Sequence, residues 1–150
     1  MEIKRIKADE WVLVIGLFDQ YRVFYKKQSD LALAERFIRE RLDNNESVIY
    51  VAMDGDKPVG FTQLYPKYSS GRAVKNWILN DLFVDPAYRK QGIGAQLINT
   101  ATAFAKAGGS EFIQLETAVD NYTAQSLYND MGFVQQPPDE AFYLYKLSLK

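Results

Sequence analysis

The stretch from Leu79 to Ala95, L-N-D-L-F-V-D-P-A-Y-R-K-Q-G-I-G-A, constrains the fold more than any other part of the sequence. Its first six residues, Leu79–Val84, are rich in β-forming side chains, and Asp85-Pro86 ends the predicted strand. From Ala95 onward apolar residues recur at helical spacing. The stretch therefore predicts a strand, a turn that contains two glycines, and a helix.

The glycine turn has the features of an anion-binding site. Gly92 and Gly94 lack a Cβ atom, so their backbone can approach a ligand closely. The helix that follows presents unpaired N–H groups and the positive end of its dipole, and Arg89 and Lys90 add two cations beside it. This combination favours a diphosphate over a single carboxylate. Ordinary strand-to-helix turns also use glycine, so the pattern alone leaves that simpler interpretation open.

The composition narrows the possible chemistry. A chain of 150 residues suits a single domain, residues 1–150, with one core. Cysteine and histidine are both absent, which excludes disulfides, thiolate nucleophiles, Ser-His-Asp relays and ordinary zinc sites, and we expect no metal. A net charge of -1 with interspersed signs argues against a nucleic-acid partner. The lack of a long apolar run or a signal peptide predicts a cytoplasmic protein with no membrane partner.

The rest of the chain predicts an α/β fold with a mixed, mostly antiparallel sheet and helices on both of its faces. Strands are expected at Glu2–Ile6, Ser47–Met53, Val59–Tyr65, Val74–Val84 and Phe112–Thr117, with a loop at Pro66–Gly71 and a final hairpin of Phe133-Val134 and Phe142–Leu149. Helices are expected at Glu10–Lys26 with Asp9 as its cap, from the cap Asp30 to Leu42, from Ala95 to Gly108-Gly109, and at Asn121–Met131. The strands on either side of the third helix should be parallel, because a crossover helix joins them.

The first predicted helix carries an apolar stripe that normally packs into a core. Asp19, Tyr21 and Tyr25 lie among its apolar residues, so the same helix could instead cover a substrate cleft. Both interpretations are compatible with the sequence.

Two other nucleotide-binding patterns were compared with the glycine turn. A P-loop would need G-x-x-x-x-G-K-[ST], which is absent. A dinucleotide-binding turn would need a third glycine where Leu97 stands, although Glu116 lies near the position of the ribose-binding acid. The antiparallel strands before the turn count against a dinucleotide-binding oxidoreductase, which stays an alternative.

Two motifs together resemble the GNAT family of N-acetyltransferases. One is the R-x-x-G-x-G run of Arg89–Gly94, and the other is Asn121–Tyr128 followed by Met131-Gly132-Phe133. The resemblance covers Ile49–Leu149 and is closest to small-amine and diamine acetyltransferases, although Asn80 stands where the diamine enzymes have a glutamate. It implies a GNAT-like fold whose sheet splays apart at the central strands.

The resemblance implies that the chain binds acetyl-CoA, an amine acceptor and no metal. The main chain of the strand end would bind the pantetheine arm, the amides of the glycine turn would bind the pyrophosphate, and an asparagine would contact the cofactor. The cofactor-binding residues would be Leu82, Phe83, Val84, Arg89, Lys90, Gln91, Gly92, Ile93, Gly94, Ala95 and Asn121. Family members often form dimers through the C-terminal region, so the aromatic residues Phe142, Tyr143 and Tyr145 suggest a homodimer.

Direct transfer of an acetyl group to an amine requires two proton transfers. An alkyl amine with a pKa near 10.4 is neutral in only about one molecule in 2,500 at pH 7, so a base is needed. Without histidine the candidates are the carboxylates of Glu116 and Asp81. The resemblance places Tyr128 at the sulfur, where a phenol could protonate the departing thiolate. A non-catalytic acyl-CoA sensor would keep the glycine turn without depending on Tyr128.

Overall fold

Five strands form one mixed sheet in the order β1-β2-β3-β4-β5 in the computed structural model, which describes residues 1–150. The strands are β1 Glu2–Arg5, β2 Val48–Asp54, β3 Lys57–Ser69, β4 Val74–Val84 and β5 Ile113–Gln114. Neighbours from β1 to β4 are antiparallel, and β5 is parallel to β4. The predicted mixed, mostly antiparallel sheet is therefore confirmed. The sheet belongs to a unit of Met1–Glu116, and Thr117–Lys150 form a second unit.

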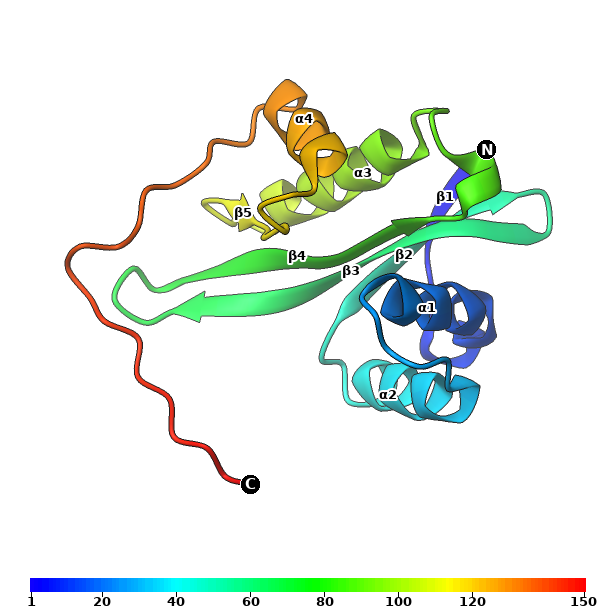
Figure 1. The fold of residues 1–150 in the computed structure, drawn as a ribbon, viewed down its shortest axis with the longest axis horizontal. Coiled ribbons are helices and arrows are strands. Elements are labelled where there is room, and N and C mark those ends of the chain that lie inside the picture. The colour runs from blue at the N-terminus through cyan, green and yellow to red at the C-terminus, as the bar shows by residue number, and fades with distance from the viewer. The chain divides into compact units, whose positions relative to one another are not determined.

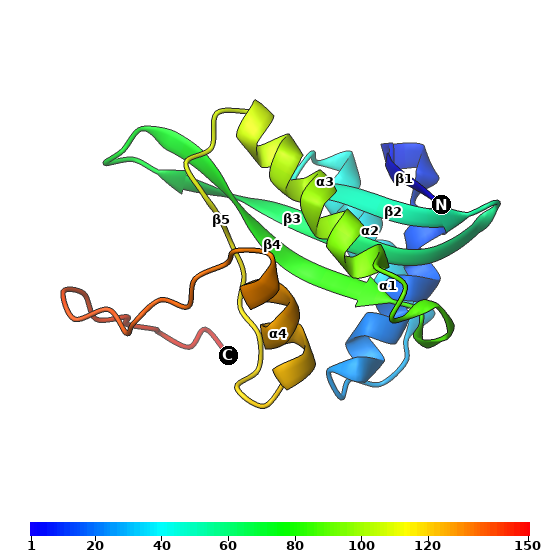
Figure 2. The same ribbon diagram turned by 90° about the horizontal axis from the view of Figure 1, so that it is seen from above.

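Helices cover both faces of the sheet, as predicted (Figures 1 and 2). They are α1 Val12–Phe24 and α2 Leu31–Asp43 on one face and α3 Ile93–Ala107 on the other. On β2, Ile49 and Val51 belong to the core that α1 and α2 form with the sheet, whereas the Tyr50 ring contacts Phe104 of α3. Because alternate residues of β2 are buried against different helices, the strand is an almost continuous apolar run.

The two N-terminal helices begin in different ways. Asp30 caps α2 as predicted, with its Oδ1 accepting a hydrogen bond of 3.1 Å from the Leu33 amide. The prediction that Asp9 caps α1 is wrong. Asp9 lies in the short 3₁₀ helix η1, Ala8–Glu10, and α1 follows without a side-chain cap. Glu10 holds this turn instead, because its carboxylate accepts from the Lys7 amide and pairs with Lys4.

The hairpin of β3 and β4 is longer than predicted. Residues 66–69, expected in a loop, continue β3, and Pro66 lies opposite Trp77 in the ladder. The Lys75 ammonium lies 5.6 Å from the Tyr68 ring centroid across the hairpin and 4.7 Å from that of Trp77. The cross-strand contact of Lys75 with Tyr68 stabilises the hairpin beyond the point where its loop residues suggest an end.

The second unit contains one helix, α4, at Tyr122–Asp130. Asn121 caps it, with Oδ1 accepting a hydrogen bond of 3.2 Å from the Ala124 amide. Within the unit the Tyr128 and Phe133 rings meet edge to face, with centroids 5.9 Å apart. None of the helices in the structure has an apolar stretch long enough to cross a bilayer.

The predicted final hairpin is wrong, because residues 133–150 form no strand. Pro137 and Pro138 have no N–H group to donate, and Asp139 Oδ1 accepts from the amides of Ala141 and Phe142 in a local turn. A two-stranded hairpin is marginal in water without a surface to pack on. The apolar side chains of the segment 142–149 are instead 78–90% exposed.

Candidate active site

One edge of β4 is open over residues 79–84. The strand pairs with β3 along its whole length, but it pairs with β5 only at Trp77 and Ile78. Opposite β3, Gln63 faces Asp81 and Leu64 faces Leu79, which leaves Asn80 as the extra residue of a β-bulge. Bulges bend and twist a strand, and this one lies just beyond the last contact with β5. The predicted splay of the sheet is present, and the open edge can pair with an extended chain of amides.

Arg89 is anchored at the end of this open edge. Asp85 Oδ1 accepts from the Ala87 amide at 2.9 Å and begins the 3₁₀ helix η2, Pro86–Tyr88. Arg89 then turns back, so that its Nε donates to the Val84 carbonyl oxygen at 2.9 Å. Its guanidinium lies 5.4 Å from the Phe83 ring centroid. The sequence thus places a fixed cation beside the last residues of β4.

The turn between Arg89 and α3 has a left-handed backbone at two positions, Lys90 with φ 62° and Gly92 with φ 80°. A Cβ on Gly92 would meet no atom within 4 Å, so the glycine serves the backbone conformation and not a close contact. Gly92 is the N-cap of α3 and provides no side-chain cap, which leaves the first amides of the helix without a side-chain acceptor. Uncapped main-chain amides at the start of α3, with the cations of Arg89 and Lys90 just before them in the chain, are suited to binding a diphosphate group.

Asp81, on the same strand, is only 2% exposed, and both of its carboxylate oxygens accept hydrogen bonds. Gln63 Nε2 donates to Oδ2 at 2.5 Å, and Asn80 Nδ2 donates to Oδ1 at 2.8 Å. The main-chain oxygen of Asp81 accepts a hydrogen bond of 2.8 Å from Thr62 Oγ1. The bulge at Asn80 and the polar residues of β3 together hold this carboxylate inside the protein.

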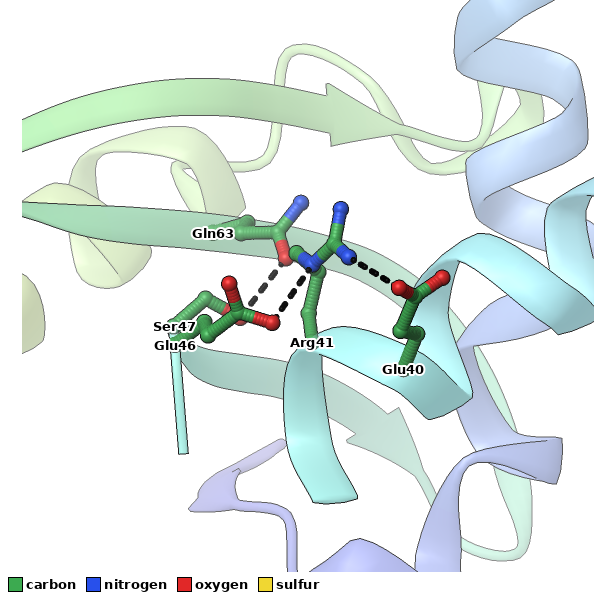
Figure 3. Close-up of polar contacts among 5 residues, drawn as sticks. All are labelled: Glu40, Arg41, Glu46, Ser47 and Gln63. Atoms are coloured by element: carbon green, nitrogen blue, oxygen red, sulfur yellow. Dashed lines mark hydrogen bonds and ion pairs between the residues drawn. The ribbon is translucent and has the colours of Figure 1, made fainter. Parts of the chain in front are cut away.

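The orientation of Gln63 is set from a neighbouring strand. Ser47, directly before β2, donates through Oγ to Gln63 Oε1 at 2.8 Å (Figure 3). This bond leaves the amide nitrogen of Gln63 free to donate to Asp81. Figure 3 also shows Arg41 of α2 between two carboxylates, at 3.3 Å from Glu40 and 3.3 Å from Glu46. Ser47, Gln63 and Asp81 therefore form one chain of hydrogen bonds.

Tyr21 reaches this network from α1. Its hydroxyl donates to the main-chain oxygen of Asn80 at 3.3 Å. Burial raises the pKa of Asp81. Hydrogen bonding from Asn80, Gln63 and Tyr21 acts in the opposite direction, but the effect of burial is larger. Burial also raises the pKa of Tyr21 and of Tyr65, and the charge of Asp81 adds to both shifts. The site therefore combines a carboxylate that accepts protons readily with phenols that stay protonated.

The other predicted site residues are less closely connected to this network. Glu116 is exposed, and its side chain makes no hydrogen bond or ion pair, so the structure favours Asp81 as the more constrained carboxylate. Asn121 and Tyr128 belong to the second unit, where Asn121 caps α4, and their roles stay predictions. No group of three His, Cys, Asp or Glu side chains lies together in a way that could hold a metal ion.

Sequence reasoning missed three members of the network: Ser47, Gln63 and the Tyr21 hydroxyl. Gln63 did carry a signal, because it is a polar residue inside an apolar strand. It is fully buried here. The sequence left two roles open for Tyr21, packing in the core or lining a substrate cleft. The periodicity of a helix cannot decide between these two roles.

A comparison with protein families assigns the chain. The model of the acetyltransferase (GNAT) family matches residues 14–133, which is most of the sequence. The chain belongs to the acetyltransferase (GNAT) family. This GNAT protein is 40% identical over 149 residues to YhfO of Bacillus subtilis (strain 168), an uncharacterized N-acetyltransferase, with 99% of this chain and 98% of YhfO covered.

Two further similarities agree. The GNAT protein is 23% identical over 153 residues to the thialysine N-epsilon-acetyltransferase of Caenorhabditis elegans, covering 97% of this chain and 91% of the relative. A crystal structure of a probable acetyltransferase matches it with a TM-score of 0.89 at 34% identity, covering 100% of this chain and 99% of the other. The predicted family and fold are confirmed, and the protein is an acetyl-CoA-dependent N-acetyltransferase. The dinucleotide-binding and non-catalytic alternatives are set aside.

Proposed function

We propose that this enzyme transfers the acetyl group of acetyl-CoA directly to a primary amine, on a small molecule or a lysine-like side chain. One observation supports this most strongly: the open edge of β4 is followed in the chain by Arg89, which is anchored to Val84, and then by the start of α3, whose first amides have no side-chain cap. An extended amide-bearing arm can pair along such an edge while the phosphates at its end meet the helix amides. The site therefore has the shape and the chemistry for coenzyme A.

The main-chain groups of Leu82, Phe83 and Val84 would bind the pantetheine arm, and Gln91–Ala95 would bind the pyrophosphate. Arg89 uses Nε for the Val84 carbonyl, which leaves its terminal nitrogens to a phosphate. Asn121 is proposed to contact the cofactor on the strength of the family resemblance. When bound, acetyl-CoA supplies an acetyl group already activated as a thioester.

Two residues would move the protons. Asp81 is the proposed base, with Glu116 as the alternative, because the Asp81 carboxylate is held in place by Gln63 and Asn80 and burial favours its protonated form. Tyr128 is the proposed acid that protonates the departing sulfur, since a phenol of pKa ~10 can protonate a thiolate of pKa ~8.5. The base makes the acceptor nitrogen nucleophilic, and the acid makes the sulfur a better leaving group.

The acceptor is proposed to carry an unhindered primary amine. The name of the C. elegans relative describes acetylation at an epsilon nitrogen, and that protein covers nearly all of this chain. Asn80 donates its amide to Asp81, so it supplies no second carboxylate of the kind found in diamine enzymes. Thialysine, lysine and a diamine form the first panel of acceptors to test.

Release of free thiol from acetyl-CoA, measured with each amine in the panel, tests the proposal. We expect thiol release that depends on the amine, with the acetylated amine detected by mass spectrometry. Tyr128→Phe should lower kcat by about 10²-fold with little change in the KM for acetyl-CoA. Tyr122→Phe, on the same helix and 73% exposed, is the matched control. An unchanged kcat in Tyr128→Phe would remove Tyr128 from the mechanism.

We propose that residues 1–150 act as one domain and that the enzyme forms a homodimer. The family model spans both units, which supports the single domain. The exposed apolar run that includes Phe142, Tyr143 and Tyr145 is a surface that a second copy could cover. Sedimentation analysis should give a dimer that Tyr145→Ser weakens. A monomer at all accessible concentrations would refute the dimer.

A further inference from the structure

The proposed base is out of reach of a substrate. Asp81 is 2% exposed, and its two carboxylate oxygens already accept hydrogen bonds from the amides of Gln63 and Asn80. A general base must lie within hydrogen-bond reach of the proton that it removes. An acceptor nitrogen can therefore exchange a proton with Asp81 only through a group that touches both.

Tyr21 has the required position. Its hydroxyl lies against the bulge and donates to the Asn80 carbonyl oxygen at 3.3 Å, next in the chain to Asp81, whose charge raises the pKa of Tyr21 in addition to burial. Its ring packs edge to face with Phe61 at a centroid distance of 5.9 Å and with Tyr25 at 4.9 Å, so the phenol is held in place. Tyr21 is half-buried, whereas Asp81 is buried. Tyr21 is thus the member of the pair that solvent and substrate can reach.

A phenol can accept and donate a proton at the same oxygen. The proton of Tyr21 is donated to the Asn80 carbonyl oxygen on β4, so the lone pairs of the hydroxyl are what an approaching ammonium group would meet. We propose that Tyr21 contacts the acceptor amine and relays its proton to Asp81. This inference rests on the proposed transfer to an amine and adds the residue through which the base acts.

The relay conserves protons and charge. The N–H bond of the ammonium breaks and leaves its electron pair on nitrogen, and the proton forms a new O–H bond on Tyr21. The Tyr21 hydroxyl turns from the Asn80 carbonyl oxygen to the neighbouring Asp81 carboxylate, its original O–H bond breaks, and that proton forms an O–H bond on Asp81. A cation and an anion become a neutral amine and a neutral acid, with Tyr21 unchanged. Burial favours this exchange, because a low-dielectric site disfavours charged forms.

The groups around the relay keep Tyr21 from ionising. Tyr25 on α1 and Asp81 on β4 both act to raise its pKa, in addition to burial. Tyr65 of β3 also faces Asp81, and Arg41 and Glu46 act on Tyr65 with opposite signs. Tyr21 therefore passes protons on while it stays a neutral phenol, and Asp81 stores the proton.

Gln63 and Ser47 are positioning residues for this relay. Ser47 fixes the amide of Gln63, and Gln63 fixes Oδ2 of Asp81, which holds the carboxylate in one orientation. Neither side chain needs to touch the substrate. Ser47→Ala should therefore lower kcat less than Tyr21→Phe does, and it should leave the KM for acetyl-CoA unchanged.

The test compares pH profiles of kcat for thialysine acetylation in the wild type, Tyr21→Phe, Asp81→Asn and the double variant. Tyr68→Phe is the matched control, because the Tyr68 side chain is 71% exposed and has no part in the relay. We expect Tyr21→Phe to lose about 10²-fold in kcat at pH 7. The loss should shrink about tenfold per pH unit as solvent deprotonates the amine. The double variant should be no slower than the slower single variant, and Tyr68→Phe should match the wild type.

Three results would overturn the relay: wild-type kcat in Tyr21→Phe, a loss of equal size at pH 7 and pH 10, or losses that multiply in the double variant. The unfolding midpoint of each variant, measured in parallel, shows whether it is folded, and Asp81→Asn tests the relay independently of Tyr21→Phe. A wild-type enzyme that acetylates none of the primary amines would refute the proposed function itself. Turnover by the wild type with no defect in Tyr21→Phe would refute the relay alone.

Discussion

Gly60→Ala tests how closely β3, β4 and α3 pack beside the open edge. A Cβ on Gly60 would lie 3.1 Å from the Phe83 carbonyl oxygen and 3.4 Å from the side chains of Leu97 and Val84. The first of these atoms belongs to the backbone of β4, so the strand itself must shift by a few tenths of an ångström. Overpacking of this kind costs about 1–3 kcal/mol. With an unfolding entropy of ~2.1 cal/mol/K per residue, a chain of 150 residues should lose about 3–10 °C in Tm.

Urea unfolding followed by tryptophan fluorescence, together with thermal melting, measures this loss. Gly16→Ala is the matched control, since Gly16 lies inside α1 with nothing within 4 Å of an added Cβ. It should raise the unfolding free energy by about 0.8–1 kcal/mol through helix propensity. Gly60→Ala should also raise the KM for acetyl-CoA, because Phe83 and Val84 lie on the open edge. A Gly60→Ala protein as stable as the wild type would refute this account of the packing.

Three further predictions concern other parts of the fold. Burial raises the pKa of Asp81 from its ordinary 3.8, so the folded state holds this proton more tightly than the unfolded state does. The unfolding free energy of the wild type should therefore fall as pH rises from about 4 through the pKa that Asp81 has in the folded state. Urea unfolding midpoints of Asp81→Asn should not show the part of this fall that Asp81 causes. Gly92 has φ 80°, so Gly92→Ala should destabilise the binding conformation of the turn by about 1–2 kcal/mol. Initial-rate assays should then show a KM for acetyl-CoA that is about 5- to 30-fold higher. An unchanged KM would contradict the role of the turn. Asp30→Ala should lower stability in urea by about 0.5–2 kcal/mol, because α2 loses its cap.

Local patterns predicted the elements that depend on nearby residues. The β-forming run to Val84, the glycine turn and the cap Asp30 each act over a few positions, and each is found where the sequence placed it. Asp9 resembled a cap equally well, but it lies inside the 3₁₀ helix Ala8–Glu10, and Trp11 stands at the N-cap of α1. A local pattern shows that a residue can cap a helix and cannot show which neighbour does so.

Features that depend on distant partners were not predictable in the same way. The burial of Asp81 requires the bulge at Asn80, the amide of Gln63 on another strand and a helix packed above them. The apolar alternation of residues 142–149 favours a strand, but a strand also needs an edge to pair with, which the pattern does not specify. The candidate base could thus be named from its position at a strand end, whereas the tyrosine beside it emerged only from the fold.

Amide hydrogen exchange with and without acetyl-CoA tests the central claim most directly, because that claim assigns binding to main-chain groups. We predict that acetyl-CoA slows exchange at Leu82–Val84 on the open edge of β4 and at Gly92–Ala95 at the start of α3. Exchange in Glu2–Arg5, at the opposite edge of the sheet, should not change. Saturation with acetyl-CoA without added protection in either segment would contradict the account.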